Sequence, residues 1–288
     1  MISTETKSRN CFLASMCIFG TIGILRRYIP LSSSVVALVR GVIGSAFLLL
    51  VILFSRRKLN TDAVRKNFPM LALSGAAIGF NWILLFEAYN HTSVATATLC
   101  YYLAPILVIL ASPIVLHETL TPKKLLCTAT ALLGMILVSG VTETGFSGIA
   151  EWKGILFGIG AAILYASVIV MNKKLPDVPA YDKTILQLSI ASIALLPYVL
   201  LTENLSAISL THLAAVLLLV AGIVHTGIAY WLYFGSMNYL SSHSVALFSY
   251  IDPILAIILS LVLLREPMTP AAGIGAVMIL AAAYFSEK

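Results

Sequence analysis

The fold is decided by residues 79–122, GFNWILLFEAYNHTSVATATLCYYLAPILVILASPIVLHETLTP, because residues 227–270 repeat them without a gap as GIAYWLYFGSMNYLSSHSVALFSYIDPILAIILSLVLLREPMTP. Sixteen of the 44 aligned positions are identical in the two copies. The identical pairs include Phe86/Phe234, Asn90/Asn238, Tyr102/Tyr250, Pro105/Pro253 and Glu118/Glu266. Two homologous apolar halves in one chain are typical of secondary transporters, whose binding site lies where the halves meet.

The composition indicates a membrane protein. Of the 288 residues, 60% are hydrophobic and 10% are charged, whereas soluble domains are roughly 25% charged. Because about 20 apolar residues span the hydrocarbon core of a bilayer, the hydropathy predicts ten transmembrane helices. The expected spans are 12–25, 33–54, 68–89, 94–116, 124–141, 154–170, 184–201, 213–234, 242–264 and 271–285.

The basic residues predict the orientation. With the N-terminus inside, 13 Lys and Arg residues, Lys173 and Lys183 among them, fall in cytoplasmic segments, and four fall in outer segments. The positive-inside rule then places both termini in the cytoplasm. We expect the protein in the inner (cytoplasmic) membrane of the cell, which it crosses several times. Because five spans per half is an odd number, we expect two inverted five-helix repeats, 10–141 and 153–286, around a central cavity. The net charge of +6 therefore reflects topology and does not indicate a nucleic-acid partner.

The ends of the repeated stretch have a structural interpretation. Thr121 can cap the helix whose first residue is Pro122, where the missing N–H costs nothing. Glu118 is expected to stabilise the same helix start at the membrane surface. The second copy repeats the pattern at Glu266 and Thr269.

The motifs resemble one transporter family. They are Ser93-Val94-Ala95, Leu103-Ala104-Pro105-Ile106 and Glu118-x-x-Thr121 in the first copy, and Asp252-Pro253-Ile254 and Glu266-x-x-Thr269 in the second. Together with Arg40, they resemble the EamA-type branch of the drug/metabolite transporter superfamily over nearly the whole chain. The resemblance implies a ten-helix basket in which helices 1–4 and 6–9 surround a cavity and helices 5 and 10 brace the outside. It also implies export of amino acids or other small metabolites or drugs.

Charged groups within the spans are candidate functional groups, because such groups are costly in a membrane and usually face a cavity or a partner. The guanidinium of Arg40 either captures a substrate carboxylate or clamps neighbouring helices. Its repeat counterpart is Gln187, if one residue of offset is allowed. Asp252, near the membrane midplane, either carries a coupling proton or is a structural aspartate. Glu87 is the second candidate for proton coupling, although an interfacial carboxylate needs no such role.

Aromatic and polar side chains at matching depth in both copies define the expected binding site. Trp82 aligns with Tyr230, and Tyr102 aligns with Tyr250. These rings either form an amphipathic pocket that stacks a ring or an ammonium group, or they pack helices together. A hydrogen-bonded histidine is the first interpretation of His225, and pH sensing is the alternative. The predicted substrate-binding residues are Arg40, Asn81, Trp82, Tyr101, Tyr102, Gln187, His225, Tyr230, Ser249 and Tyr250.

Other protein classes are disfavoured by missing motifs. The chain has no Gly-x-x-x-x-Gly-Lys-Ser/Thr loop for an ATP motor, and no His-Glu-x-x-His or Gly-x-Ser-x-Gly for an intramembrane enzyme. Neither a metal nor a cofactor is expected. We therefore expect a secondary transporter, in the export direction, of amino acids or amphipathic compounds. Its partners are a small-molecule substrate, the lipid bilayer and protons; a passive facilitator of the same fold is the alternative.

Overall fold

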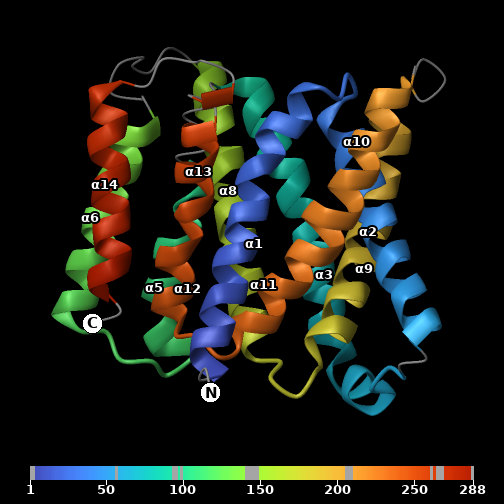
Figure 1. The fold of residues 1–288 in the computed structure, drawn as a ribbon, viewed down its shortest axis with the longest axis horizontal. Helices are drawn as coiled ribbons and strands as arrows, with labels where there is room; N and C mark the ends of the chain where they lie inside the picture. The colour runs from blue at the N-terminus through green and yellow to red at the C-terminus, as the bar shows by residue number, and fades with distance from the viewer. Residues whose placement is uncertain are drawn as a thin grey trace.

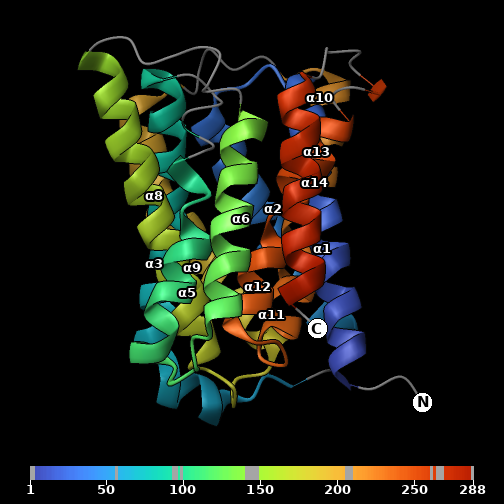
Figure 2. The same cartoon turned by 90° about the vertical axis from the view of Figure 1, so that its left-hand side faces the viewer.

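The computed structural model describes residues 4–286 except 56–57, 93–96, 98–99, 140–148, 205–209, 260–261 and 264–268. The described residues form helices and no strand. The helices run side by side along one direction (Figures 1 and 2). The elements are α1 (Thr4–Arg27), α2 (Ser33–Ser55), α3 (Thr61–His91), α5 (Ala104–Val115), α6 (Pro122–Ser139), α8 (Ile149–Lys173), α9 (Ala180–Thr202), α10 (His212–Gly222), η2 (Ile223–Ile228), α11 (Ala229–Met237), α12 (Ser242–Ser249), α13 (Ile251–Leu259) and α14 (Pro270–Ser286).

The surface of this bundle is that of a membrane protein. Within the part of the chain that the structure describes, five helical stretches are long and apolar enough to cross a bilayer: Ser33–Phe54, Thr61–Leu85, Trp152–Lys173, Ala180–Thr202 and His212–Met237. Large apolar side chains point outward, with Phe54 85% and Leu201 87% exposed, which only a lipid environment makes favourable. The predicted all-helical membrane fold is confirmed, whereas the count of ten spans and the inverted repeat stay predictions.

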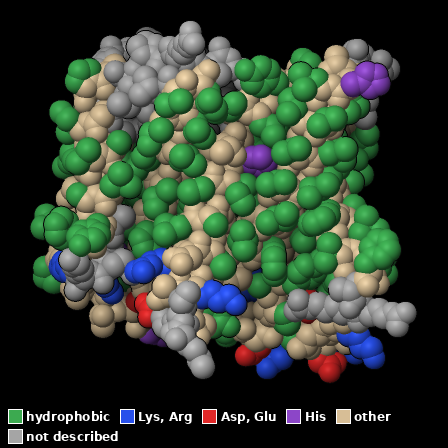
Figure 3. Space-filling view, in the orientation of Figure 1, with side chains coloured by type: hydrophobic (Ala, Val, Ile, Leu, Met, Phe, Trp, Pro, Cys, Tyr) green, Lys and Arg blue, Asp and Glu red, His purple; other side chains and the backbone are tan. Residues whose placement is uncertain are grey.

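Charged side chains gather at one end of the bundle, at the lower edge of Figure 3. The starts of α3, α6 and α9 and the end of α8 lie at this edge (Figure 1). These segments contain Asp62, Arg65, Lys66, Lys123, Lys124, Lys173, Lys174, Asp182 and Lys183. We call this the charged end. Lys183 is fully buried there, and its Nζ donates to the Asn172 carbonyl at 3.1 Å.

Helix contacts between the N-terminal half (α1–α6) and the C-terminal half (α8–α14) occur in corresponding pairs. The contact of α3 with α8 corresponds to the contact of α1 with α11. The contact of α5 with α8 corresponds to that of α1 with α13. The contact of α3 with α9 corresponds to that of α2 with η2 and α10. The pairs α2 with α9 and α6 with α14 join elements that occupy the same place in each half, and α5 packs on α12, the helix just before its own counterpart α13. α6 and α14 form a pair at one edge of the bundle (Figures 1 and 2).

Two close approaches between helices depend on glycine. A Cβ atom on Gly134 of α6 would lie 2.6 Å from the Gly275 carbonyl oxygen of α14, and a Cβ on Gly20 of α1 would lie 2.8 Å from the Asp252 carbonyl oxygen of α13. Both contacts are with backbone, which has little freedom to move. Glycine therefore sets the distance between α6 and α14 and brings α1 against the start of α13.

The helices are interrupted where the repeat carries proline and in the expected span 213–234. The helix over 242–259 breaks at Tyr250, just before Pro253, and α5 begins at Ala104, just before Pro105. Between α10 and α11 the chain forms the π-helix η2, and the hydroxyl of Thr226 donates to the Ala221 carbonyl at 2.8 Å. π-Helical turns inside α-helices are frequent at functional sites.

The expected caps are partly confirmed. The hydroxyl of Thr121 accepts the backbone N–H of Lys124 at 3.3 Å, so Thr121 caps α6 as predicted. Glu118 also binds a helix start, but it is the start of α12 in the other half rather than that of α6. The prediction for Glu118 was therefore right in kind and wrong in partner; Glu266 lies outside the described residues.

Candidate functional site

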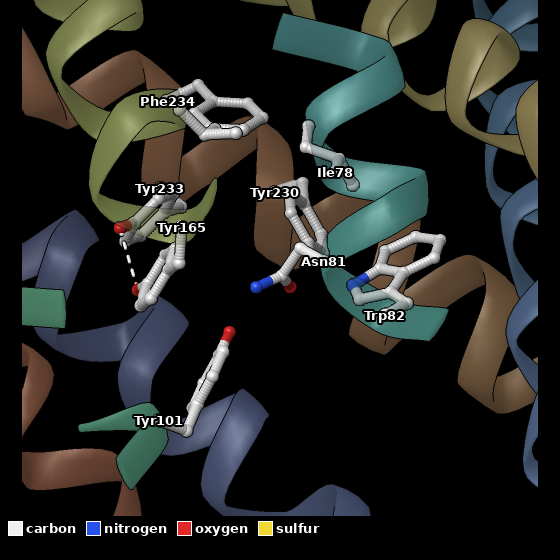
Figure 4. Close-up of a pocket in the computed structure, with 9 residues that line it drawn as sticks. Ile78, Asn81, Trp82, Tyr101, Tyr165, Tyr230, Tyr233 and Phe234 are labelled. Atoms are coloured by element: carbon white, nitrogen blue, oxygen red, sulfur yellow. Dashed lines mark hydrogen bonds between the residues drawn. The ribbon is translucent and has the colours of Figure 1, made fainter. Parts of the chain in front are cut away.

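A small cavity, with room for about one water molecule in this conformation, lies between the two halves. The N-terminal half contributes residues of α3 and Tyr101, just before α5, and the C-terminal half contributes residues of α8 and α11 (Figure 4). The lining residues are Ile78, Asn81, Trp82, Tyr101, Tyr165, Val168, Tyr230, Tyr233 and Phe234. This is the place that the repeat predicts for a binding site.

Stacked and hydrogen-bonded tyrosines form one wall. The rings of Tyr101 and Tyr165 stack with centroids 5.2 Å apart and an angle of 6° between their planes. The hydroxyls of Tyr165 and Tyr233 are hydrogen-bonded at 2.9 Å, as the dashed line in Figure 4 marks. Tyr101 belongs to the N-terminal half, whereas Tyr165 and Tyr233 belong to the C-terminal half. The stack of Tyr101 on Tyr165 therefore joins the halves at the cavity.

The opposite wall combines an amide with two aromatic rings. Asn81 donates through Nδ2 to the Ala161 carbonyl at 2.6 Å. In Figure 4 its amide and the Tyr101 hydroxyl point toward the same space. Trp82 meets the ring of Tyr230 edge-on, with centroids 6.2 Å apart. The lining side chains thus supply π-faces, phenol hydroxyls and an amide without a charged group, which suits an amphipathic molecule.

Arg40 reaches this wall through Trp82. The guanidinium carbon lies 4.5 Å from the centroid of the Trp82 ring, within the range of a cation–π interaction. Nε of Arg40 is buried and has no hydrogen-bond partner among the described residues. Arg40 is not among the residues that line the cavity. In this conformation its charge therefore acts on the cavity through the indole rather than by direct contact.

Asp252 is not a lining residue of the cavity, but its partner Tyr102 is the chain neighbour of the lining residue Tyr101. Its carboxylate and the hydroxyl of Tyr102 are hydrogen-bonded to each other. Tyr102 meets Tyr101 edge-on, with centroids 5.7 Å apart, and its carbonyl accepts the Tyr250 hydroxyl at 3.1 Å. Tyr102 and Tyr250 are equivalent residues of the repeat. Their hydrogen bond joins the two copies and holds Tyr102, the partner of Asp252, in place.

The remaining predicted residues lie in helix contacts outside the cavity lining. His225 of η2 is hydrogen-bonded through Nε2 to the Thr21 hydroxyl of α1, at 2.8 Å. Gln187 of α9 is fully buried and donates to the hydroxyl of Ser74 in α3. The Ser249 hydroxyl donates to the Val245 carbonyl of its own helix at 2.7 Å.

Glu87 is also away from the cavity. Its carboxylate accepts the Tyr198 hydroxyl of α9, and His91 lies one turn further along α3 with Nε2 3.9 Å from it. These contacts provide a structural explanation for a carboxylate at the end of α3 opposite the charged end.

Five lining residues were not predicted from the sequence: Ile78, Tyr165, Val168, Tyr233 and Phe234. Tyr233 follows Tyr230 by three residues, and Ile78 precedes Asn81 by three. Helical spacing places both on the predicted faces. Phe234 belongs to an identical pair of the repeat. Tyr165 and Val168 lie outside the gap-free repeat, which therefore gives no indication of them.

A bundle of apolar helices around an amphipathic cavity defines the class of polytopic membrane transporters. The model of the EamA-like transporter family matches residues 10–140 and 152–287. The chain therefore belongs to the EamA-like transporter family.

Two relatives are named as transporters, and a solved structure shares the fold. The chain is similar to an uncharacterized transporter, YxxF, of Bacillus subtilis (strain 168), with 29% identity over 97% of this chain and 90% of the relative. It is also similar to an uncharacterized transporter of Archaeoglobus fulgidus, with 30% identity over 74% of this chain and 75% of the relative. A crystal structure of a protein with 18% identity superposes with a TM-score of 0.85 over 97% of both chains, which shows a shared fold.

Proposed function

We propose that the protein is a proton-coupled secondary transporter that exports a small amphipathic metabolite across the cytoplasmic membrane by alternating access. The observation that carries the proposal is the cavity between the halves, which α3 and Tyr101 of the N-terminal half line together with α8 and α11 of the C-terminal half. A site built from both halves changes its exposure when the halves change their relative position.

The corresponding helix contacts support the inverted repeat. The most extensive contacts between the halves have a counterpart or join equivalent elements. Exchanging the conformations of the two halves then yields a second arrangement with the same kinds of contact, which opens toward the other side of the membrane. The charged end faces the cytoplasm in this proposal, because it holds the Lys and Arg residues of α3, α6 and α8.

The lining chemistry favours a substrate that carries both a ring or apolar side chain and polar groups, such as an aromatic amino acid. Tyr101, Tyr165 and Tyr230 offer π-faces to a ring or an ammonium group, and Asn81 together with the phenol hydroxyls offers hydrogen bonds. Asp252, bound to Tyr102 beside this wall, carries the coupling proton. A carboxyl group bound to Tyr102, the neighbour of the lining residue Tyr101, can exchange its proton in step with substrate binding.

A thermal-shift screen with a matched pair of tryptophan variants tests the binding site. A ligand at 100 times its Kd stabilises the folded protein by about 2.7 kcal/mol, so aromatic amino acids should raise the melting temperature. Trp82→Leu removes a cavity wall and should abolish the shift. Trp231→Leu is the control, because Trp231 is 40% exposed and packs on Tyr181 instead. Equal shifts in the two variants would place the ligand outside the cavity.

A further inference from the structure

A group of hydrogen bonds and an ion pair joins the two halves at the charged end, around the carboxylate of Glu118. Both carboxylate oxygens accept the backbone N–H of Ser242, at 3.1 and 3.0 Å, and Oε1 also accepts the Ser242 hydroxyl at 2.8 Å. Nζ of Lys173 lies 3.5 Å from Oε1 and donates to the Leu240 carbonyl. We call Glu118, Lys173, Leu240 and Ser242 the latch.

The latch connects segments that are far apart in the sequence. Glu118 follows α5 in the N-terminal half, whereas Lys173 ends α8 and Ser242 begins α12 in the C-terminal half. A carboxylate at a helix start is stabilised by the free N–H groups and the helix dipole. The contact is therefore a helix cap supplied by the opposite half, with a lysine ion pair added to it.

Burial makes this contact stronger than an ordinary surface ion pair. The side chain of Lys173 is 9% exposed and that of Glu118 is 25% exposed. Exposed ion pairs contribute little because water and salt screen them, whereas charge-assisted hydrogen bonds in a shielded site are strong. Loss of Glu118 would also leave the ammonium of Lys173 shielded without its partner carboxylate.

The latch lies at the charged end, beyond the lining residues of the cavity along α8 and along the chain after α11. On α8, Lys173 follows the lining residue Val168 by five residues, about 7.5 Å at 1.5 Å per residue. Leu240 follows the lining residue Phe234 by six residues. Glu118 therefore joins the N-terminal half to the two segments, the end of α8 and the start of α12, that connect the cavity lining with the charged end.

We propose that the latch holds the charged end shut and that it must break each time the cavity opens toward that end. The proposal rests on the proposed alternating access, because it assigns this structure to the state closed at the charged end. Weakening the latch lowers the cost of opening and shifts the population toward the open state.

The variants separate the ion pair from the helix cap. Glu118→Gln keeps the shape and removes the charge. Exchanging the charges, with Glu118→Lys and Lys173→Glu together, keeps opposite charges but leaves no acceptor for the Ser242 N–H beside residue 118, so closure should not be restored. Asp62→Asn is the control, because Asp62 is an exposed acid on the first turn of α3 at the same end.

Accessibility of a cavity position measures the opening directly. Val168→Cys, in a chain whose four cysteines are replaced by alanine, is treated with a membrane-impermeant methanethiosulfonate in inside-out vesicles. We expect slow modification in the parent and in Asp62→Asn, and roughly tenfold faster modification with Glu118→Gln, which corresponds to about 1.4 kcal/mol. The charge exchange should be as fast as Glu118→Gln. Equal rates in the parent and in Glu118→Gln would overturn the proposal. A return to the parent rate in the exchanged pair would support closure by the ion pair and refute a need for the helix cap.

The labelling needs no substrate, so the latch and the transport activity can fail separately. Faster labelling in a protein that moves no tested metabolite would support the latch and count against the proposed function. Unchanged labelling in a protein that transports would refute the latch alone. Size-exclusion chromatography and thermal unfolding check that each variant is folded. If Glu118→Gln does not fold, Lys173→Gln, which keeps a donor for the Leu240 carbonyl, decides the matter by the same labelling rates.

Discussion

Arg40 and Trp82 should act on the substrate as a unit. The guanidinium carbon of Arg40 lies 4.5 Å from the Trp82 ring centroid, and Trp82 is 4% exposed while it lines the cavity. Cation–π contacts are worth about 0.5–1 kcal/mol when exposed and about 2 kcal/mol when desolvated. For this shielded pair we expect about 1–2 kcal/mol, equivalent to a factor of about 5–30 in an equilibrium constant.

A double-mutant cycle measures this coupling. Arg40→Lys keeps the positive charge and loses the flat guanidinium face, so substrate affinity should fall by about 5-fold or more. Trp82→Leu removes the ring and should weaken binding further. In the Trp82→Leu background, Arg40→Lys should have almost no additional effect, because its contact with the cavity is already lost. Affinity is read from the ligand dependence of the melting temperature, with Arg65→Lys, an exposed residue of α3, as the control.

Additivity would refute this reasoning. If Arg40→Lys lowers the affinity by the same factor with and without Trp82, the guanidinium contacts the substrate directly, as a carboxylate-capturing arginine would. If both single variants bind normally but melt at lower temperature, the pair only supports the helix packing.

Three further predictions concern coupling, the tyrosine wall and the outer helix pair. Asp252→Asn keeps the shape but cannot titrate, so it should bind and exchange substrate in proteoliposomes without pH-driven accumulation; accumulation at the parent level would move the coupling role to Glu87 or His225. Tyr165→Phe removes the 2.9 Å hydrogen bond to Tyr233 and should lower stability by about 1 kcal/mol in thermal unfolding, and an unchanged melting temperature would mean that this bond contributes nothing. Gly134→Ala places a Cβ 2.6 Å from the Gly275 carbonyl oxygen and should cost about 1–3 kcal/mol. Gly160→Ala, which meets only the Leu84 side chain at 3.2 Å, is the control, and equal melting temperatures for the two variants would argue against a tight pairing of α6 and α14.

The helical membrane fold was predictable because the apolar runs and the repeat are strong sequence patterns. Asn81, Trp82, Tyr101 and Tyr230 were predicted as binding residues and line the cavity, since repeat alignment and helix depth place them at matching positions. Tyr165 was not predicted, because it lies outside the two gap-free copies of the repeat, residues 79–122 and 227–270. Contacts between the halves, such as Glu118 with Ser242, depend on tertiary packing that sequence spacing does not encode.

Local helix geometry explains why other predicted residues are found outside the cavity lining. His225 lies within the wider turn of η2, so a wheel drawn with 3.6 residues per turn misplaces it relative to the lining residue Tyr230. His225 meets Thr21 of α1. Gln187 lies in the contact between α9 and α3, where Gly75 brings the two backbones together. Their predicted roles in substrate binding remain to be tested by substitution.

The central claim, proton-coupled transport through the cavity, is tested most directly by uptake of a radiolabelled aromatic amino acid into proteoliposomes whose lumen is more acidic than the bath. Protons that leave the lumen through an exchanger drive substrate inward, so the account predicts accumulation above the bath concentration. It also predicts that a protonophore and Trp82→Leu each abolish this accumulation. Uptake that stops at the bath concentration, with or without the pH gradient, would contradict proton coupling and identify a passive facilitator. Uptake no greater than in protein-free liposomes, across amino acids and small organic cations, would contradict the proposed transport itself.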